Sequence, residues 1–324
     1  MRFLPSKRIA RVLMLAVGLI GSGGLLLLAI MVHQGRRAPT GRPAYVALGS
    51  SYAAGYGLGD RGADSPFACM RGEGGYPPSV ARELALLLVD VSCSGATAAQ
   101  VLHGGQYFQK SQISVIRHDT RLVTLTAGGN DLFYVGDLLG LAKRKQGGIV
   151  GWAARVLLQA PHDDAERDAD RLRADFRAII ETVRSTAPAV VLVITTYPPI
   201  LPAQGSCPAL GLTVREAAMM RAVAAKLAEA TRSAASGAGV VLVDMATLGS
   251  GHDACSTVPW VNGANAKPGD GAAFHPTRLG AAATANAIAE AVRGLRTDRG
   301  FQTAAGGVRA IQSHRRRLHS SRGR

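Results

Sequence analysis

Five short apolar segments, separated by stretches with helical periodicity, constrain the fold of this chain most strongly. The clearest of them, residues 189–194, is apolar throughout, which is typical of a strand buried on both faces of a sheet. The others are residues 45–48, 89–92, 122–126 and 240–243. Strands that alternate with helices in this way form a parallel sheet between two helical layers. We therefore predict a three-layer α/β/α domain with a mostly parallel sheet.

Apolar residues recur at helical spacing between these strands. The expected helices cover residues 77–88, the segment after Pro161, residues 213–235 and residues 279–292. We expect Leu87 and Met219 to point toward the core. We also expect Asp163 or Asp164 to cap the helix after Pro161, because short acidic side chains accept the free N–H groups of a first turn.

Residues 138–160 mix large apolar side chains with basic ones and allow three interpretations. Two ordinary packed helices are the interpretation that we favour. A mobile cover over a site and a patch that touches lipid are the alternatives.

The uncharged run from Val12 to Val32 contains 21 residues. A helix rises ~1.5 Å per residue, so this run spans roughly 30 Å, the thickness of a bilayer's hydrocarbon core. The run is longer than the apolar part of a cleavable signal peptide, and it ends without a small-residue cleavage site. We therefore expect a single-pass membrane anchor with the domain outside the cytoplasm, and a secreted form is the alternative.

The net charge of +15 is concentrated at the two ends of the chain. The seven basic residues of 1–42 and the nine of 293–324 leave 21 basic against 21 acidic residues between these ends. A neutral middle argues against a nucleic-acid partner and favours ends that lie near anionic lipid or in solvent. The predicted division is a basic stub (1–11), a membrane segment (12–32), a linker (33–42), one globular domain (43–295) and a disordered basic tail (296–324).

The four cysteines give no metal-binding pattern. Cys69, Cys93, Cys207 and Cys255 form no Cys-x-x-Cys pair, and no histidine lies at zinc-finger spacing, so we expect no metal. An even number of cysteines after an export segment indicates two disulfides and an oxidising compartment. Of the three possible pairings we favour Cys69–Cys93 and Cys207–Cys255, because these close loops of modest length in separate parts of the chain.

Small polar residues follow three of the strands, where a parallel sheet places its ligands. Ser51, Gly95 and Asn130 belong to these clusters, and His275 stands directly before the last helix. Acyl transfer needs a nucleophile, a base that titrates near neutrality, and donors for the oxyanion. These residue types meet those needs, and the chain has neither a Gly-x-Ser-x-Gly turn nor a nucleotide-binding loop.

The four blocks occur in the order found in the SGNH hydrolases, the GDSL-type esterases and lipases, and the likeness covers residues 43–295. The resemblance implies that Ser51 is the nucleophile and that His275 is its base. It also implies that the N–H groups of Ser51 and Gly95 and the amide of Asn130 form the oxyanion hole. The surroundings of Cys93 look like those of the disulfide-containing secreted branch. Asp131, next to Asn130, is expected to cap the helix that follows it.

Two positions depart from the family pattern. Ser50 stands where the family usually has Asp, although this residue is not one of the four catalytic groups. Ala272 stands where the family usually has the Asp that orients the histidine, and loss of such an acceptor can cost ~10⁴ in rate in a serine protease. Resemblance to relatives without this Asp implies a main-chain carbonyl. We favour that of Ala272, with Asp270 as the alternative.

We therefore expect a serine ester hydrolase that acts outside the cytoplasm through an acyl-Ser51 intermediate and needs no cofactor. The membrane segment and residues 138–160 favour acyl lipids as substrates, and acylated glycans stay open. An acyltransferase that uses the same residues is one alternative. A non-catalytic envelope binding module on the same fold is the other, because the usual Asp is missing. We expect a monomer.

Overall fold

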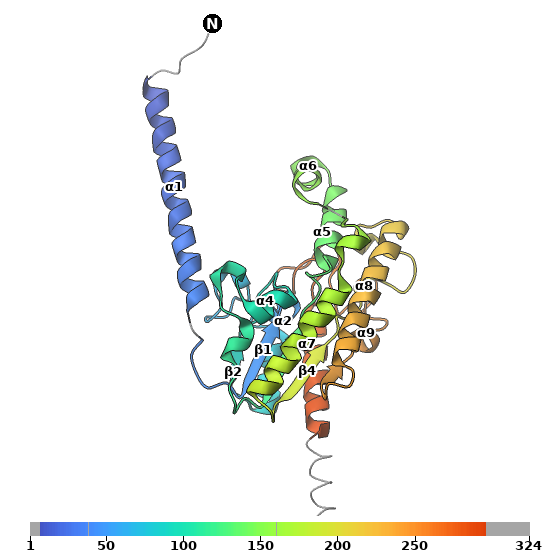
Figure 1. Cartoon of the computed structure of the whole chain (residues 1–324). Coiled ribbons are helices and arrows are strands. Elements are labelled where there is room, and N and C mark those ends of the chain that lie inside the picture. Colours follow the sequence, from blue (N-terminus) through green and yellow to red (C-terminus); the bar gives the residue numbers. More distant parts are fainter. Residues whose placement is uncertain (1–6, 38, 160, 296–324) are drawn as a thin grey trace, which may run out of the picture.

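Five parallel strands form the central sheet in the order β2-β1-β3-β4-β5 (Figure 1). The structure, a computed structural model, describes residues 7–37, 39–159 and 161–295. The strands are β1 (Tyr45–Gly49), β2 (Leu88–Asp90), β3 (Leu122–Thr126), β4 (Val191–Thr195) and β5 (Val241–Val243). The predicted α/β/α fold with a parallel sheet is confirmed. The basic tail, 296–324, lies outside the described residues.

Helices cover both faces of this sheet, and two apolar clusters lie between the layers. The helices of the domain are α2 (Ser51–Ala54), α3 (Tyr76–Leu84), α4 (Ala98–His103), α5 (Tyr134–Arg144), α6 (Gly148–Leu157), α7 (Ala169–Thr186), α8 (Val214–Ala235), α9 (Met245–Leu248) and a last helix over residues 278–295. One cluster joins the sheet to α4, α5, α7 and α8, and the other joins it to α3 and the last helix. Neighbouring strand residues alternate between the clusters: Val123 belongs to the cluster with α4, α5, α7 and α8, and Leu122 belongs to the cluster with α3 and the last helix.

A tight turn connects the end of β1 to the start of α2. Strand β1 pairs with β3 from Tyr45 opposite Leu122 to Gly49 opposite Thr126. Gly49 has a φ of 132°, and a Cβ there would lie 2.1 Å from the carbonyl oxygen of Thr126. Only glycine fits this close approach, which lets the chain leave the sheet and begin α2 at Ser51.

Three local predictions were wrong. Helix α3 ends at Leu84 because Ala85 takes a left-handed conformation (φ 51°), and Leu87 is 74% exposed instead of buried. Met219 of α8 is 36% exposed instead of buried. Helix α7 is capped by Asp168, which accepts the N–H of Arg171, while Asp163 and Asp164 belong to a separate 3-10 turn.

Helices α5 and α6 form a hairpin whose two members pack differently. Helix α5 buries Tyr134, Leu138 and Leu141, as an ordinary packed helix does. In α6 the buried residues are the small ones, Gly151 and Ala154. The large apolar side chains of α6 and the residue after it are exposed, namely Ile149, Val150, Trp152, Val156, Leu157 and Leu158. The prediction of two ordinary packed helices is therefore confirmed for α5 and wrong for α6.

The N-terminal segment is one long helix, α1 (Lys7–Arg36), which extends away from the domain (Figure 1). Among the described residues, one helix is long and apolar enough to cross a membrane, with Gly18–Arg36 as the candidate span. Its end is fixed to the domain, since Gln34 accepts the N–H of Phe67 at 2.7 Å. Gly35 also lies against the main chain of Tyr107, where a Cβ would come within 2.3 Å of the carbonyl oxygen.

Both disulfides have the expected partners. Cys69–Cys93 joins the loop after α2 to the end of β2, two residues before Gly95. Cys207–Cys255 joins the loops that follow β4 and α9. Each bond therefore fixes a loop at the carboxyl end of the sheet.

Candidate active site

Ser51 is the first residue of α2 and is only 8% exposed. The preceding Ser50 makes no side-chain cap to the helix. Its hydroxyl instead lies 2.9 Å from the hydroxyl of Tyr197, which also accepts the N–H of Gly129 at 3.3 Å. The residue in the family's usual Asp position thus links the Ser51 turn to the loop after β3.

The structure brings Ser51 and His275 together across 224 positions of sequence. The Oγ of Ser51 lies 2.8 Å from Nε2 of His275, and Nδ1 of His275 lies 2.8 Å from the carbonyl oxygen of Ala273. A carbonyl can only accept, so Nδ1 carries the proton and Nε2 has a free lone pair. This tautomer can accept the proton of the Ser51 hydroxyl.

The acceptor at Nδ1 is neither of the two expected groups. The carbonyl of Ala272 accepts the main-chain N–H of His275 at 3.1 Å. The carboxylate of Asp270 accepts the main-chain N–H of Arg278 at 2.7 Å. Phe274, between Ala273 and His275, has a left-handed conformation (φ 57°), and in this turn the Ala273 carbonyl is the one within reach of the imidazole. The expectation of a main-chain carbonyl is right in kind, but the residue is Ala273.

Two tyrosines that the sequence reasoning missed surround His275. The hydroxyl of Tyr52 donates to the carbonyl of Phe274 at 2.6 Å, and its ring centroid lies 5.4 Å from that of the imidazole. Tyr56 meets the imidazole edge-on at 5.2 Å. A signal existed in the sequence, because Tyr52 directly follows the nucleophile and Tyr56 stands five residues after it, but their distant partner could only be seen in the fold.

Burial keeps His275 neutral. Removal of the imidazole from water lowers its pKa to about 4, and the hydrogen bond to Ala273 opposes this shift. At neutral pH the side chain is therefore an uncharged base beside a hydroxyl.

Two main-chain N–H groups in the loops that follow β1 and β2 are available to a ligand. Within residues 7–37, 39–159 and 161–295, the N–H groups of Ser51 and Gly95 have no acceptor. Gly95 has a φ of 86°, a conformation that favours glycine. Gln106 holds this turn, since its Nε2 donates to the carbonyl of Ser94 at 2.8 Å.

Asn130 and Asp131 connect the loop after β3 to the turn at Gly95. Nδ2 of Asn130 donates to the carbonyl of Ala96 at 2.9 Å, which leaves its second N–H for another acceptor. The carboxylate of Asp131 accepts the N–H of Ala98 at 3.0 Å, so it caps α4 and not the helix that follows it. Burial raises the pKa of Asp131 to about 6, and its hydrogen bonds to main-chain N–H groups oppose the shift.

Two further titratable residues, Asp244 and His252, have structural partners. Asp244 accepts hydrogen bonds from Thr196 and Arg232. Nδ1 of His252 lies 2.8 Å from the carbonyl of Val258. The part of the chain that the structure describes contains no group of three or more His, Cys, Asp or Glu residues that could hold a metal ion.

A parallel α/β/α fold with a Ser–His pair at the carboxyl end of its sheet is the arrangement of an enzyme that transfers acyl groups through a serine. The sequence pattern of the GDSL-like Lipase/Acylhydrolase family matches residues 47–283, and the chain belongs to this family. Lipase 2 of Streptomyces coelicolor is 31% identical over 258 residues, which cover 78% of this chain and 86% of that protein. A lipase of Streptomyces rimosus is 27% identical over 237 residues, 73% of this chain and 81% of that protein.

Two crystal structures share the fold over nearly their whole length. The extracellular lipase from Streptomyces rimosus has a TM-score of 0.61 and 28% identity, and the match covers 76% of this chain and 98% of the lipase. Phospholipase A1 from Streptomyces albidoflavus has a TM-score of 0.60 and 26% identity, over 77% of this chain and 98% of the phospholipase. The predicted SGNH fold and the ester hydrolase class are confirmed. The extracellular relative and the two disulfides agree with an extracytoplasmic location.

Proposed function

We propose that this protein is a membrane-anchored lipase that hydrolyses long-chain acyl esters of lipids through an acyl-Ser51 intermediate. The observation that carries the proposal is the pair of contacts, each 2.8 Å long, that link Ser51 to His275 and His275 to the Ala273 carbonyl. These contacts favour catalysis over the binding-module alternative, which was considered because the usual Asp is missing.

The reaction has two halves that use the same groups. In the first, Nε2 of His275 takes the proton of the Ser51 hydroxyl while Oγ bonds to the ester carbonyl carbon. The tetrahedral intermediate collapses when His275 gives that proton to the leaving alcohol, and an acyl-Ser51 ester remains. In the second, water loses a proton to His275 as it attacks the acyl carbon, and His275 then gives that proton to Oγ of Ser51 as the acyl–Oγ bond breaks and the fatty acid leaves.

Three donors would stabilise the negative charge of the tetrahedral intermediate. We assign this role to the N–H groups of Ser51 and Gly95 and to the side-chain amide of Asn130. The two main-chain groups lack acceptors within the described residues, and the Ala96 carbonyl orients the Asn130 amide. Donors that are fixed before the charge develops need no reorganisation during the reaction, which is the reason for their large effect.

Lipid substrates and a membrane anchor are supported by two independent facts. Helix α1 contains a candidate span, and its lower end is hydrogen-bonded to the domain. Relatives over most of the chain are named lipases, and one structural relative is a phospholipase A1. We propose the division of the chain given above, with residues 43–295 as the catalytic domain outside the cytoplasm and residues 12–32 in the bilayer.

The test is hydrolysis of p-nitrophenyl esters from acetyl to palmitoyl by the full chain in detergent, beside Ser51→Ala. The variant should lose at least about 10³-fold in kcat with all esters. The wild type should prefer the longer acyl chains. Preference for the acetyl ester would contradict the lipid substrate, and full activity of Ser51→Ala would contradict the nucleophile. Ser185→Ala is the control, because it removes an exposed hydroxyl of α7 that donates to the Thr182 carbonyl of the same helix.

A further inference from the structure

Helix α6 presents an apolar face to solvent. Ile149, Trp152 and Val156 follow the spacing of one helix face and are 82%, 60% and 60% exposed. Leu157, beside them, is 75% exposed. A helix on the surface of a soluble domain normally turns such residues inward, so this face needs a cover other than water.

Basic residues flank this apolar face, and acidic ones are missing from the surrounding sequence. No Asp or Glu occurs between Asp137 and Asp163. Lys143, Arg144 and Lys145 end α5, and Arg155 lies on α6. Lys145 pairs with Glu216 of α8, and Arg155 donates to the carbonyl of Arg144. Large apolar residues together with Lys and Arg are the composition of a helix that lies in a membrane interface.

The hairpin of α5 and α6 stands at the carboxyl end of the sheet. Helix α5 begins four residues after Asn130, and α6 extends beyond the domain at the same end as α1 (Figure 1). The last helix ends at the opposite side of the domain, as expected for a helix that runs antiparallel to the strands. The site at Ser51 and the exposed face of α6 therefore belong to the end of the domain from which α1 departs.

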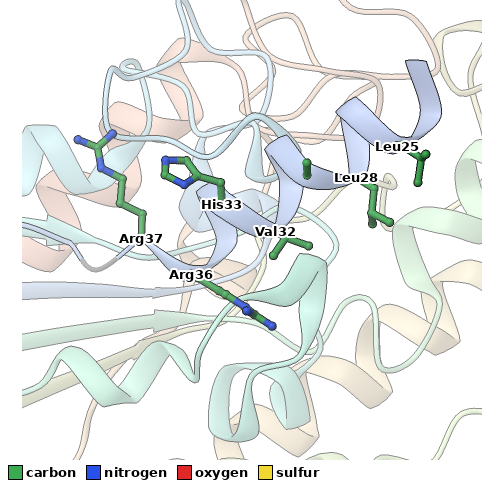
Figure 2. Close-up of a pocket in the computed structure, with 7 residues that line it drawn as sticks. Leu25, Leu28, Val32, His33, Arg36 and Arg37 are labelled. Atoms are coloured by element: carbon green, nitrogen blue, oxygen red, sulfur yellow. The ribbon is translucent and has the colours of Figure 1, made fainter. Parts of the chain in front are cut away.

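The lower end of α1 marks where a bilayer would end. Figure 2 shows Leu25, Leu28 and Val32 on α1, followed by His33 and two arginines at its base. These residues form an open surface along α1 that contains no part of the Ser51 site. Because Gln34 is hydrogen-bonded to Phe67, the domain begins directly below this boundary.

We propose that α6 is a second membrane contact: its apolar face enters the outer leaflet of the bilayer that α1 spans, and its basic flank meets anionic lipid headgroups. The occupant of this surface is thus an anionic lipid bilayer. The proposal rests on the proposed function in one respect, the membrane span of α1. With two contacts instead of one, the domain is held with its catalytic end toward the lipid esters.

The first test measures whether Trp152 lies in lipid. The chain has two tryptophans, Trp152 and Trp260, so Trp260→Phe leaves Trp152 as the only reporter. The full chain is placed in nanodiscs of phosphatidylcholine with phosphatidylglycerol, with plain or brominated acyl chains. Brominated lipid should quench the Trp152 emission by about half or more, because bromine quenches only at short range inside the leaflet.

A reporter at the other end of the domain is the matched control. Leu87 is an apolar residue of similar exposure at the amino end of β2, so Leu87→Trp in a chain without Trp152 and Trp260 should show no quenching. Unquenched Trp152 emission would overturn the proposal. So would emission that resists an aqueous quencher without responding to bromine, since a protein would then cover the face. Equal quenching in pure phosphatidylcholine would overturn the role of the basic flank.

The second test separates docking from chemistry. The double substitution Ile149→Glu and Trp152→Glu should lower hydrolysis of phosphatidylglycerol in nanodiscs by about tenfold and leave p-nitrophenyl acetate hydrolysis within about twofold of wild type. Leu87→Glu should change neither rate. Equal loss of both rates would show that α6 supports the fold of the site, and would contradict the proposal.

The two proposals fail in different ways. If Trp152 is quenched but the wild type cleaves no bilayer ester, the docking stands and the lipid substrate is wrong. If the wild type cleaves bilayer esters and Trp152 remains in water, the docking is wrong and the proposed function stands.

Discussion

The core beneath the Ser51 site and helix α6 differ in which apolar side chains they bury. Leu125 of β3 and Phe176 of α7 are completely buried, and the buried hydroxyl of Thr126 lies 2.6 Å from that of Thr195. In α6 the small Ala154 is buried while Leu157 is 75% exposed. The first arrangement is what burial in water produces, because apolar area leaves the solvent and polar groups find partners. The second leaves apolar area in contact with water wherever the proposed bilayer does not cover it, and this is the contrast between the two regions.

The sharpest test of this comparison makes the same substitution in both regions. Leu125→Ala leaves a cavity in the core and should lower the free energy of unfolding by about 2–5 kcal/mol. Leu157→Ala removes a side chain that packs on little and should change it by less than about 0.5 kcal/mol. Thermal and urea unfolding of the full chain in detergent measure both. An equal loss for Leu157→Ala would show that α6 is packed like the core.

The next largest effect is expected at the oxyanion donors. Asn130→Ala removes the oriented amide and should lower kcat by about 10²–10³-fold. The melting temperature should change little, because the hydrogen bond of Asp131 to Ala98 still joins the two loops. Asn265→Ala, at an exposed position, is the matched control for stopped-flow ester assays. A kcat like that of wild type would remove Asn130 from the proposed site.

The five apolar segments were sufficient to predict the sheet, and the order of the four sequence blocks was sufficient to predict the meeting of Ser51 with His275. The sequence could not predict which carbonyl faces His275, because the answer depends on the left-handed φ of Phe274, an unusual conformation for a residue with a side chain. Nor could it predict that α6 would turn outward. Its apolar spacing fits an inner face as well as an outer one, and in the fold the buried side of α6 is the one with the small residues Gly151 and Ala154.

A smaller effect is expected for the residue that holds the histidine turn. Tyr52→Phe removes the donor to the Phe274 carbonyl and should lower kcat by about tenfold, the equivalent of one hydrogen bond, with KM unchanged. Tyr56→Phe keeps the ring contact with His275 and should stay within about twofold of wild type. If both variants behave alike, Tyr52 acts through its ring alone and not through the turn.

The smallest effect on activity is expected when the pH is lowered to mildly acidic values. His275 must be neutral to accept a proton, and its pKa is lowered to about 4, so activity should persist as pH falls from 7 to 5 and decline with a midpoint of about 4. Stability follows the same group, because the unfolded chain takes up this proton near pH 6.5 and the folded chain only near pH 4. The free energy of unfolding should therefore decrease as the pH is lowered from 6.5 to about 4. The decrease should be smaller in His275→Gln, which has no imidazole to protonate. A pH profile of kcat/KM with a midpoint near 6.5 would contradict a buried, neutral base.

The central claim is that His275 activates Ser51 and no other serine. The most direct measurement is the mass of the full chain after reaction with a fluorophosphonate, followed by peptide mapping. The account predicts one adduct on Ser51, none on the adjacent Ser50, and none in Ser51→Ala or His275→Gln. An adduct that persists in Ser51→Ala, or one that maps to another serine, would contradict it.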